Sequence, residues 1–206
     1  MARNVFISFR FNDGAVYKDE LIKLFESSSE VINYSENVDR SNMADETIKK
    51  YLYDKLRNTS VTIVLITPNA ISHNKNWLGQ YDDWMYDEIR YSLEDRENNR
   101  SNGLIAVYTT EAKNSIITKK THKCGICNKE SEITSISDCD NLFRKNMMNV
   151  KQAYKTNKCN GVFDSDKDSY CSLVSWEDFK NNFSKYIEIA VEKREEINKY
   201  NLVKRL

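Results

Sequence analysis

Glycine and proline are scarce in this chain of 206 residues, which has five glycines and one proline. The glycines, at positions 14, 79, 103, 125 and 161, are too far apart for a GxGxxG turn or a Walker phosphate loop. An excess of either charge is also absent, because Lys plus Arg and Asp plus Glu each number 31. Proteins that bind nucleic acid or membrane surfaces usually carry a basic excess. We therefore expect neither of these partners and no glycine-loop nucleotide site.

Long hydrophobic segments are absent as well. No apolar run approaches the roughly 20 residues of a membrane span. The first ten residues hold only a short apolar run with polar interruptions, whereas a secretory leader has a longer one. The five cysteines are an odd number and all follow residue 123, which argues against a disulfide framework. We therefore expect a cytoplasmic protein with reduced thiols.

Strand and helix patterns alternate over the first 108 residues. Apolar, β-branched runs predict strands at 5–9, 31–34, 61–66 and 104–108, the third being the strongest. Helical spacing predicts a helix capped by Asp13, a second through 48–56 capped near Asn42 or Asp45, and a third over 79–97. This alternation predicts a doubly wound α/β fold with a mainly parallel sheet and a ligand site at the carboxyl ends of its strands.

The second half of the chain departs from this pattern. Residues 110–168 are polar, hold four of the five cysteines and are too long for a plain loop, so they predict an insertion with structure of its own. A last strand is expected at 170–174. Ser175, with Asp178 three residues later, predicts the cap of a long C-terminal helix over 175–200, with fraying after residue 195. We expect residues 1–206 to form a single domain that includes both additions.

Few residue patterns indicate chemistry by themselves. Thr67, Pro68 and Asn69 follow the central strand where a receiver domain needs a phosphoacceptor aspartate, and His73 is most simply a loop residue. Trp84 and Glu88 are four residues apart and share a helix face. From spacing alone, Glu88 is more simply a boundary glutamate that reaches solvent. A solvated acidic face is likewise the simpler interpretation of the aspartates at 82, 83 and 87.

Three segments nevertheless resemble a known family in order and spacing. They are the opening strand with its polar tail (Val5–Asp13), the central strand with its approach (Asn58–Ile66), and Trp84–Ser92, which has the form W-x-x-x-E-I-x-x-S. Together with the strand at 104–107 they resemble the TIR-like proteins of bacterial Thoeris anti-phage systems, of the ThsB type, over roughly residues 3–110. The resemblance implies a three-layer TIR/flavodoxin-like fold and makes Glu88 the catalytic residue of NAD cleavage.

The chemistry of that reaction is compatible with a single carboxylate. Nicotinamide leaves NAD as a neutral molecule and needs no general acid, and one carboxylate can stabilise the positive charge that develops on the ribose. The resemblance therefore implies NAD as substrate, no required cofactor, and a cyclic, linear or conjugated ADP-ribose product that signals to a separate effector protein. A phage trigger and a homo-oligomer are further expected partners. The alternatives are a non-catalytic TIR-like interaction module and a nucleotide-sensing binding domain.

Around Glu88 we expect a substrate site formed by the end of the first strand and the helix. Phe9 and Phe11 could stack on a base, although Phe9 could equally be the last core residue of its strand, and Arg10 could pair with the pyrophosphate. Ser8, most simply a strand residue, and Trp84 complete this expected set. Asp87 also belongs to it, although some relatives have tyrosine at that position.

The motif Cys124-Gly125-Ile126-Cys127 is a second chemical feature. A CxxC knuckle can place two thiolates on one zinc ion, and Cys139, Cys159 or His122 could complete the ligand set. A second CxxC motif is absent from the sequence. A structural zinc at Cys124 and Cys127 is therefore one hypothesis, and ordinary reduced thiols are the other.

Overall fold

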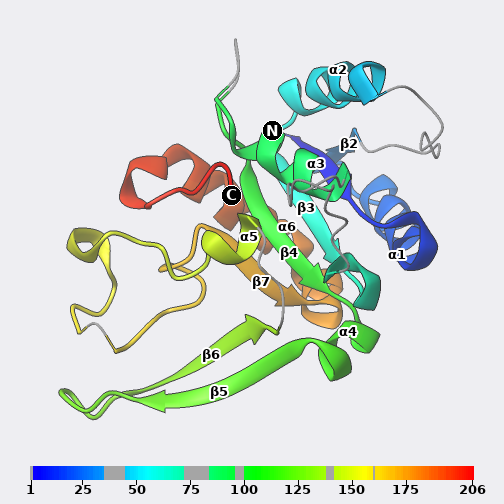
Figure 1. Cartoon of the computed structure of the whole chain (residues 1–206). Coiled ribbons are helices and arrows are strands. Elements are labelled where there is room, and N and C mark those ends of the chain that lie inside the picture. Colours follow the sequence, from blue (N-terminus) through cyan, green and yellow to red (C-terminus); the bar gives the residue numbers. More distant parts are fainter. Residues whose placement is uncertain (1, 35–44, 72–83, 96–99, 138–141, 160) are drawn as a thin grey trace, which may run out of the picture.

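The computed structural model describes residues 2–34, 45–71, 84–95, 100–137, 142–159 and 161–206 (Figure 1). Its centre is a five-stranded parallel sheet in the order β2-β1-β3-β4-β7. The strands are β1 (Arg3–Ser8), β2 (Val31–Asn33), β3 (Val61–Ile66), β4 (Gly103–Tyr108) and β7 (Cys171–Ser175). All side chains of β3 and β4 are buried, as expected for central strands covered on both faces.

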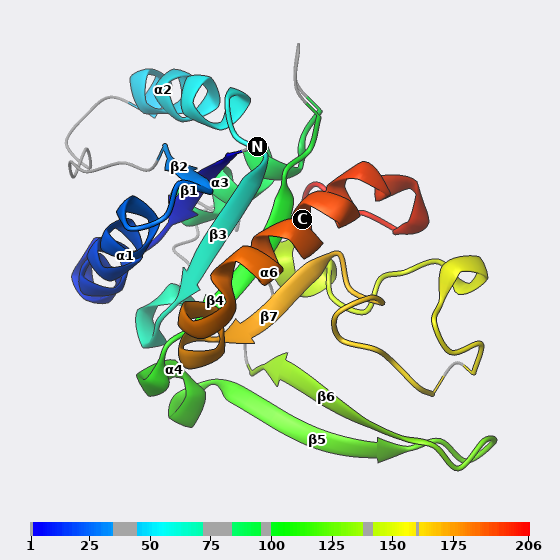
Figure 2. The same cartoon turned by 180° about the vertical axis from the view of Figure 1, so that it is seen from behind.

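Helices cover both faces of the sheet (Figures 1 and 2). Val5 and Ile7 of β1 pack with α1 (Phe11–Glu26) and α6 (Trp176–Glu195). The opposite face, which carries Phe6, packs with α2 (Asp45–Arg57), α3 (Trp84–Leu93) and the short α5 (Leu142–Lys145). This period-2 alternation along β1 sends neighbouring residues into different cores. The predicted three-layer, TIR/flavodoxin-like α/β fold is confirmed.

The predicted strands at 61–66, 104–108 and 170–174 agree with β3, β4 and β7 to within a residue. The proposed cap of the first helix is wrong, because α1 begins at Phe11 with Arg10 at its N-cap, and Asp13 lies within the first turn. The third helix ends at Leu93 rather than residue 97. There the Ser101 hydroxyl donates to the Leu93 carbonyl at 2.6 Å and satisfies the helix end. Asn42, His73, the loop expected at 35–44 and the helix start expected at 79 lie outside the described residues.

The insertion has its own elements between the neighbouring strands β4 and β7. It begins with α4 (Thr110–Ser115), continues into an antiparallel hairpin of β5 (Ile117–Lys123) and β6 (Glu130–Ile136), and includes a 3-10 turn at Gln152–Tyr154. The hairpin extends away from the sheet in both views (Figures 1 and 2). The prediction that this region has structure of its own is confirmed.

The C-terminal helix begins as predicted, because the Ser175 hydroxyl accepts from the backbone N–H of Asp178 at 3.1 Å. It ends at residue 195, and the prediction that the chain frays beyond it is wrong. A 3-10 turn follows (Ile197–Lys199), and Tyr200 is buried and bridges to Val150. Apolar contacts of the tail with the α5 region hold it in place. Among the described residues, no helix is both long and apolar enough to cross a membrane.

Candidate functional site

Glu88 lies on α3, beside the carboxyl end of β1. Ser8, the last residue of β1, is fully buried, and its hydroxyl donates to Oε2 of Glu88 at 2.5 Å. The Glu88 side chain itself is half-buried. Two residues that are 80 positions apart therefore form a charge-assisted hydrogen bond at the sheet edge where α/β folds bind ligands.

A buried chain of hydroxyl and amide groups fixes the helix that carries this carboxylate. Asn102 donates to the Thr62 hydroxyl at 3.0 Å, and the hydroxyls of Thr62 and Ser92 lie 2.7 Å apart. Ser92 in turn donates to the backbone carbonyl of Glu88 at 2.7 Å. Ile89, fully buried beside Glu88, packs the same helix onto the sheet. The serine of the W-x-x-x-E-I-x-x-S pattern thus has a structural role, because it joins the backbone of α3 to Thr62 of β3.

Phe9, Arg10 and Phe11 form the turn that follows β1. The rings of Phe9 and Phe11 lie 4.7 Å apart, so the two aromatics expected near the substrate contact each other. Phe9 packs against the core on the α1 side, whereas Phe11 keeps 39% of its surface exposed. The Arg10 carbonyl accepts the first helical N–H, from Gly14, at 2.7 Å. Of the two rings, Phe11 is the better placed to meet a ligand, and Phe9 is mainly a core residue.

Asp13 connects the ends of two neighbouring strands. One oxygen of its carboxylate accepts from the Thr67 hydroxyl at 2.8 Å, and the other accepts from the backbone N–H of Asn69 at 3.0 Å. Asn69 belongs to the 3-10 turn that follows β3 (Pro68–Ile71). Sequence reasoning missed this role, because the cap signal at Asp13 is local whereas its partners are more than 50 residues away.

A groove of about 760 Å³ opens beside these strand ends, bounded by α1, α4 and α6. On its wall, the Tyr17 hydroxyl donates to the carboxylate of Glu111, and the Tyr17 ring meets Trp176 edge-on at 4.7 Å. Burial and then the Glu111 carboxylate raise the pKa of Tyr17 to about 12, so the phenol stays protonated. Glu88 is not among the residues of this wall, because it lies on the α3 side of the sheet.

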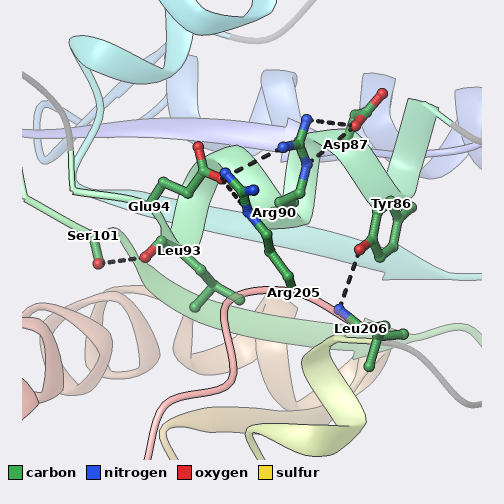
Figure 3. A network of polar contacts seen from close by, with 8 residues as sticks. All are labelled: Tyr86, Asp87, Arg90, Leu93, Glu94, Ser101, Arg205 and Leu206. Atoms are coloured by element: carbon green, nitrogen blue, oxygen red, sulfur yellow. Dashed lines mark hydrogen bonds and ion pairs between the residues drawn. The ribbon is translucent and has the colours of Figure 1, made fainter. Parts of the chain in front are cut away.

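Asp87 pairs within its own helix rather than with Ser8. The Asp87 carboxylate pairs with Arg90 one turn along α3, at 3.0 Å, in a network that continues through Glu94 to Arg205 of the tail (Figure 3). Trp84 begins α3, and its side chain lies outside the described part of the structure. The geometry therefore gives Asp87 a partner of its own and joins Ser8 to Glu88.

The cysteine motif lies far from this edge, at the tip of the β5–β6 hairpin. The sulfur atoms of Cys124, Cys127 and Cys159 lie within 4.8 Å of one another. Cys139 lies outside the described residues. The hypothesis of a shared metal site therefore gains a third thiol, Cys159, from the segment that precedes β7.

Comparison with known protein families covers the segment that includes Ser8 and Glu88. A family model described as Thoeris protein ThsB, TIR-like domain, matches residues 6–114. The chain belongs to this ThsB family. The match begins within β1 and ends within α4. It includes both Ser8 and Glu88 and stops before the β5–β6 hairpin. The cysteine-bearing part of the insertion therefore lies outside the matched region.

Proposed function

We propose that this ThsB-family protein is an NAD-cleaving enzyme of anti-phage defence and that Glu88 is its catalytic residue. The observation that carries the proposal is the hydrogen bond at 2.5 Å between the buried Ser8 hydroxyl and the Glu88 carboxylate, at the carboxyl edge of a parallel sheet. Membership of the TIR-like ThsB family supports it. The ADP-ribose product, cyclic in our proposal, would activate a separate effector protein.

The proposed chemistry requires little from the protein beyond position and charge. As the C1′–N bond to nicotinamide breaks, the bonding electrons leave with the neutral base and positive charge develops on the ribose. A carboxylate held beside the ribose stabilises that charge, more strongly where water is excluded. Ser8 acts here as a positioning residue, because its side chain is fully buried and reaches the substrate only through Glu88. Phe11 offers an exposed aromatic face for a base at the mouth of the site.

The decisive experiment compares wild-type protein with Glu88→Gln in NAD turnover, followed by chromatography and mass spectrometry of the nucleotides. Glu94→Gln is the matched control, because Glu94 directly follows the last residue of the same helix and forms ion pairs with Arg90 and Arg205 away from Ser8. Reactions include lysate from phage-infected cells as the source of a trigger. We expect NAD loss with wild type and with Glu94→Gln, and none with Glu88→Gln.

The same assay distinguishes the alternatives. If no variant consumes NAD even with the infected lysate, the protein is better described as an interaction module, and the enzymatic proposal is wrong. Turnover that persists in Glu88→Gln would remove Glu88 from the catalytic role. The mass and retention of the product separate cyclic, linear and conjugated ADP-ribose, since cyclisation uses a group of the same molecule whereas linear product takes up water.

A further inference from the structure

The tip of the β5–β6 hairpin is a compact knuckle built around Cys124. The backbone N–H of Cys124 donates to the Lys129 carbonyl, and the N–H of Asn128 donates to the Cys124 carbonyl, both at 2.9 Å. Asn128 has a φ of 56°, the left-handed conformation that such a tight turn requires. Inside the turn, the backbone N–H groups of Ile126 and Cys127 donate to the sulfur of Cys124. The turn places the sulfurs of Cys124 and Cys127 within 4.8 Å of each other.

A second chain segment brings a third thiol to the same point. The sulfur of Cys159 lies 2.9 Å from that of Cys124, and the backbone N–H of Gly161 donates to the Cys159 sulfur. At both Cys124 and Cys159 the sulfur accepts from the backbone N–H two residues later. The donors are Ile126 and Gly161, respectively. Two independent segments present sulfurs in the same way.

His122 is an exposed residue that borders this cluster, although its ring nitrogens lie outside the set of three sulfurs that are within 4.8 Å of one another. It lies two residues before Cys124, so both side chains project from the same face of the hairpin. A Cβ on Gly161 would lie 3.0 Å from the Cys124 sulfur and 3.2 Å from Nε2 of His122. A side chain at this position would be tightly packed, and the two distances put Nε2 of His122 within about 6 Å of the Cys124 sulfur. The ligand types are the three cysteines and one histidine of a common structural zinc site.

The third sulfur and the lack of an apolar core favour a metal over a disulfide. A disulfide joins sulfurs at about 2.05 Å, shorter than the 2.9 Å between Cys124 and Cys159. It would also leave the third sulfur, that of Cys127, unused. Zn–S bonds of about 2.3 Å in a tetrahedron place sulfurs about 3.8 Å apart, which is within the 4.8 Å limit of the three-sulfur set and longer than the 2.9 Å between Cys124 and Cys159. The hairpin tip has little apolar core of its own, since Cys124 is its single buried side chain between residues 118 and 130.

We propose that Cys124, Cys127, Cys159 and His122 bind one structural zinc ion. The ion joins the β5–β6 hairpin to the segment before β7 and takes the place of the missing apolar core. Four protein ligands leave no open coordination position, so the site stabilises the insertion and takes no part in nucleotide chemistry. This proposal is independent of NAD cleavage, because the cluster and Glu88 belong to different parts of the fold.

Elemental analysis of the full-length protein, purified without chelators, tests the proposal. We expect about one zinc ion per chain in wild type and a loss of most of it in Cys127→Ser, an exposed position where the change is compatible with folding. Cys159→Ser should lose zinc in the same way. Cys171→Ala is the matched control, because Cys171 is a buried thiol of β7 outside the cluster and should leave the zinc content unchanged.

Two further measurements identify the ligands. Cobalt(II) added to zinc-free protein should give the intense visible bands of a tetrahedral thiolate site, and these bands should change in His122→Ala. Intact mass without reductant should show free thiols after zinc removal. The proposal is overturned if wild type carries no zinc and shows no cobalt bands, if a Cys124–Cys159 disulfide is found, or if Cys127→Ser retains full zinc.

Discussion

Removing the Ser8 hydroxyl is the sharpest test of how the candidate site is organised. In Ser8→Ala the Glu88 carboxylate loses a buried, charge-assisted donor that lies 2.5 Å away. Hydrogen bonds to charged groups contribute about 1.5–3 kcal/mol, and about 1.4 kcal/mol corresponds to a tenfold change in rate. If that energy fixes the carboxylate for the transition state, kcat for NAD cleavage should fall by about 10- to 100-fold.

The buried position of Ser8 determines which kinetic constant should change. Because Ser8 is fully buried at the end of β1 and touches Glu88, its loss should lower kcat and leave KM nearly unchanged. The measurement is steady-state NAD consumption with the trigger at saturation, together with a thermal melt of each variant. Ser92→Ala is the matched control, since it removes another buried hydroxyl from the same region without touching the carboxylate.

Two results would refute the reasoning. A kcat of Ser8→Ala within about twofold of wild type would show that the hydrogen bond does not position Glu88 for the reaction. An equal loss of kcat in Ser92→Ala, with a similar drop in melting temperature, would attribute the effect to weakened packing of α3. A loss confined to Ser8→Ala supports the positioning role.

Two further predictions concern stability. A methyl group on Gly103 would lie 2.2 Å from a backbone carbonyl oxygen of α6, so Gly103→Ala should lower the free energy of unfolding by about 2 kcal/mol or more in urea titrations. Gly125→Ala is the control and should be neutral, because a methyl group there meets nothing within 4 Å. Equal free energies of unfolding for the two variants would contradict this prediction. Burial lowers the pKa of Lys193 from 10.5 to about 8. At pH 7 the difference between the pKa of Lys193 in the folded and unfolded chain lowers the free energy of unfolding by about 3 kcal/mol. Lys193→Met should therefore be more stable by about 2 kcal/mol after about 1 kcal/mol is subtracted for the lost hydrogen bond to Ser172. Between about pH 8 and 10.5 the unfolded chain holds more protons than the folded one, so wild type should gain stability with rising pH and approach the variant. The control is Lys180→Met, at a partly exposed site of the same helix, which should show no such pH dependence. A Lys193→Met variant that is less stable than wild type at pH 7 would contradict the argument.

The elements that the sequence predicted well are those whose signals are local. The apolar run of β3 could only be a strand buried on both faces, and Ser175 with Asp178 predicted the start of α6 because a capping contact spans three residues. The proposal that Glu88 is catalytic came from its place in a short family pattern, and the structure adds its hydrogen bond to Ser8. The scarcity of glycine was equally informative, since composition and spacing by themselves exclude a glycine-rich phosphate-binding loop.

Tertiary structure alone decided the contacts that join these elements at the candidate sites. Ser8 and Glu88 meet because the register of β1 against β3 and the packing of α3 on the sheet bring together residues 80 positions apart. The same holds for Asp13 with Thr67 and for the third thiol beside the CxxC knuckle. The C-terminal tail packs because the bridge between Val150 and Tyr200 and apolar side chains from distant segments hold it in place. The charged composition of the tail gives no sign of these contacts. Periodicity and capping depend on neighbours within a few residues, whereas these pairings depend on how whole strands and helices align.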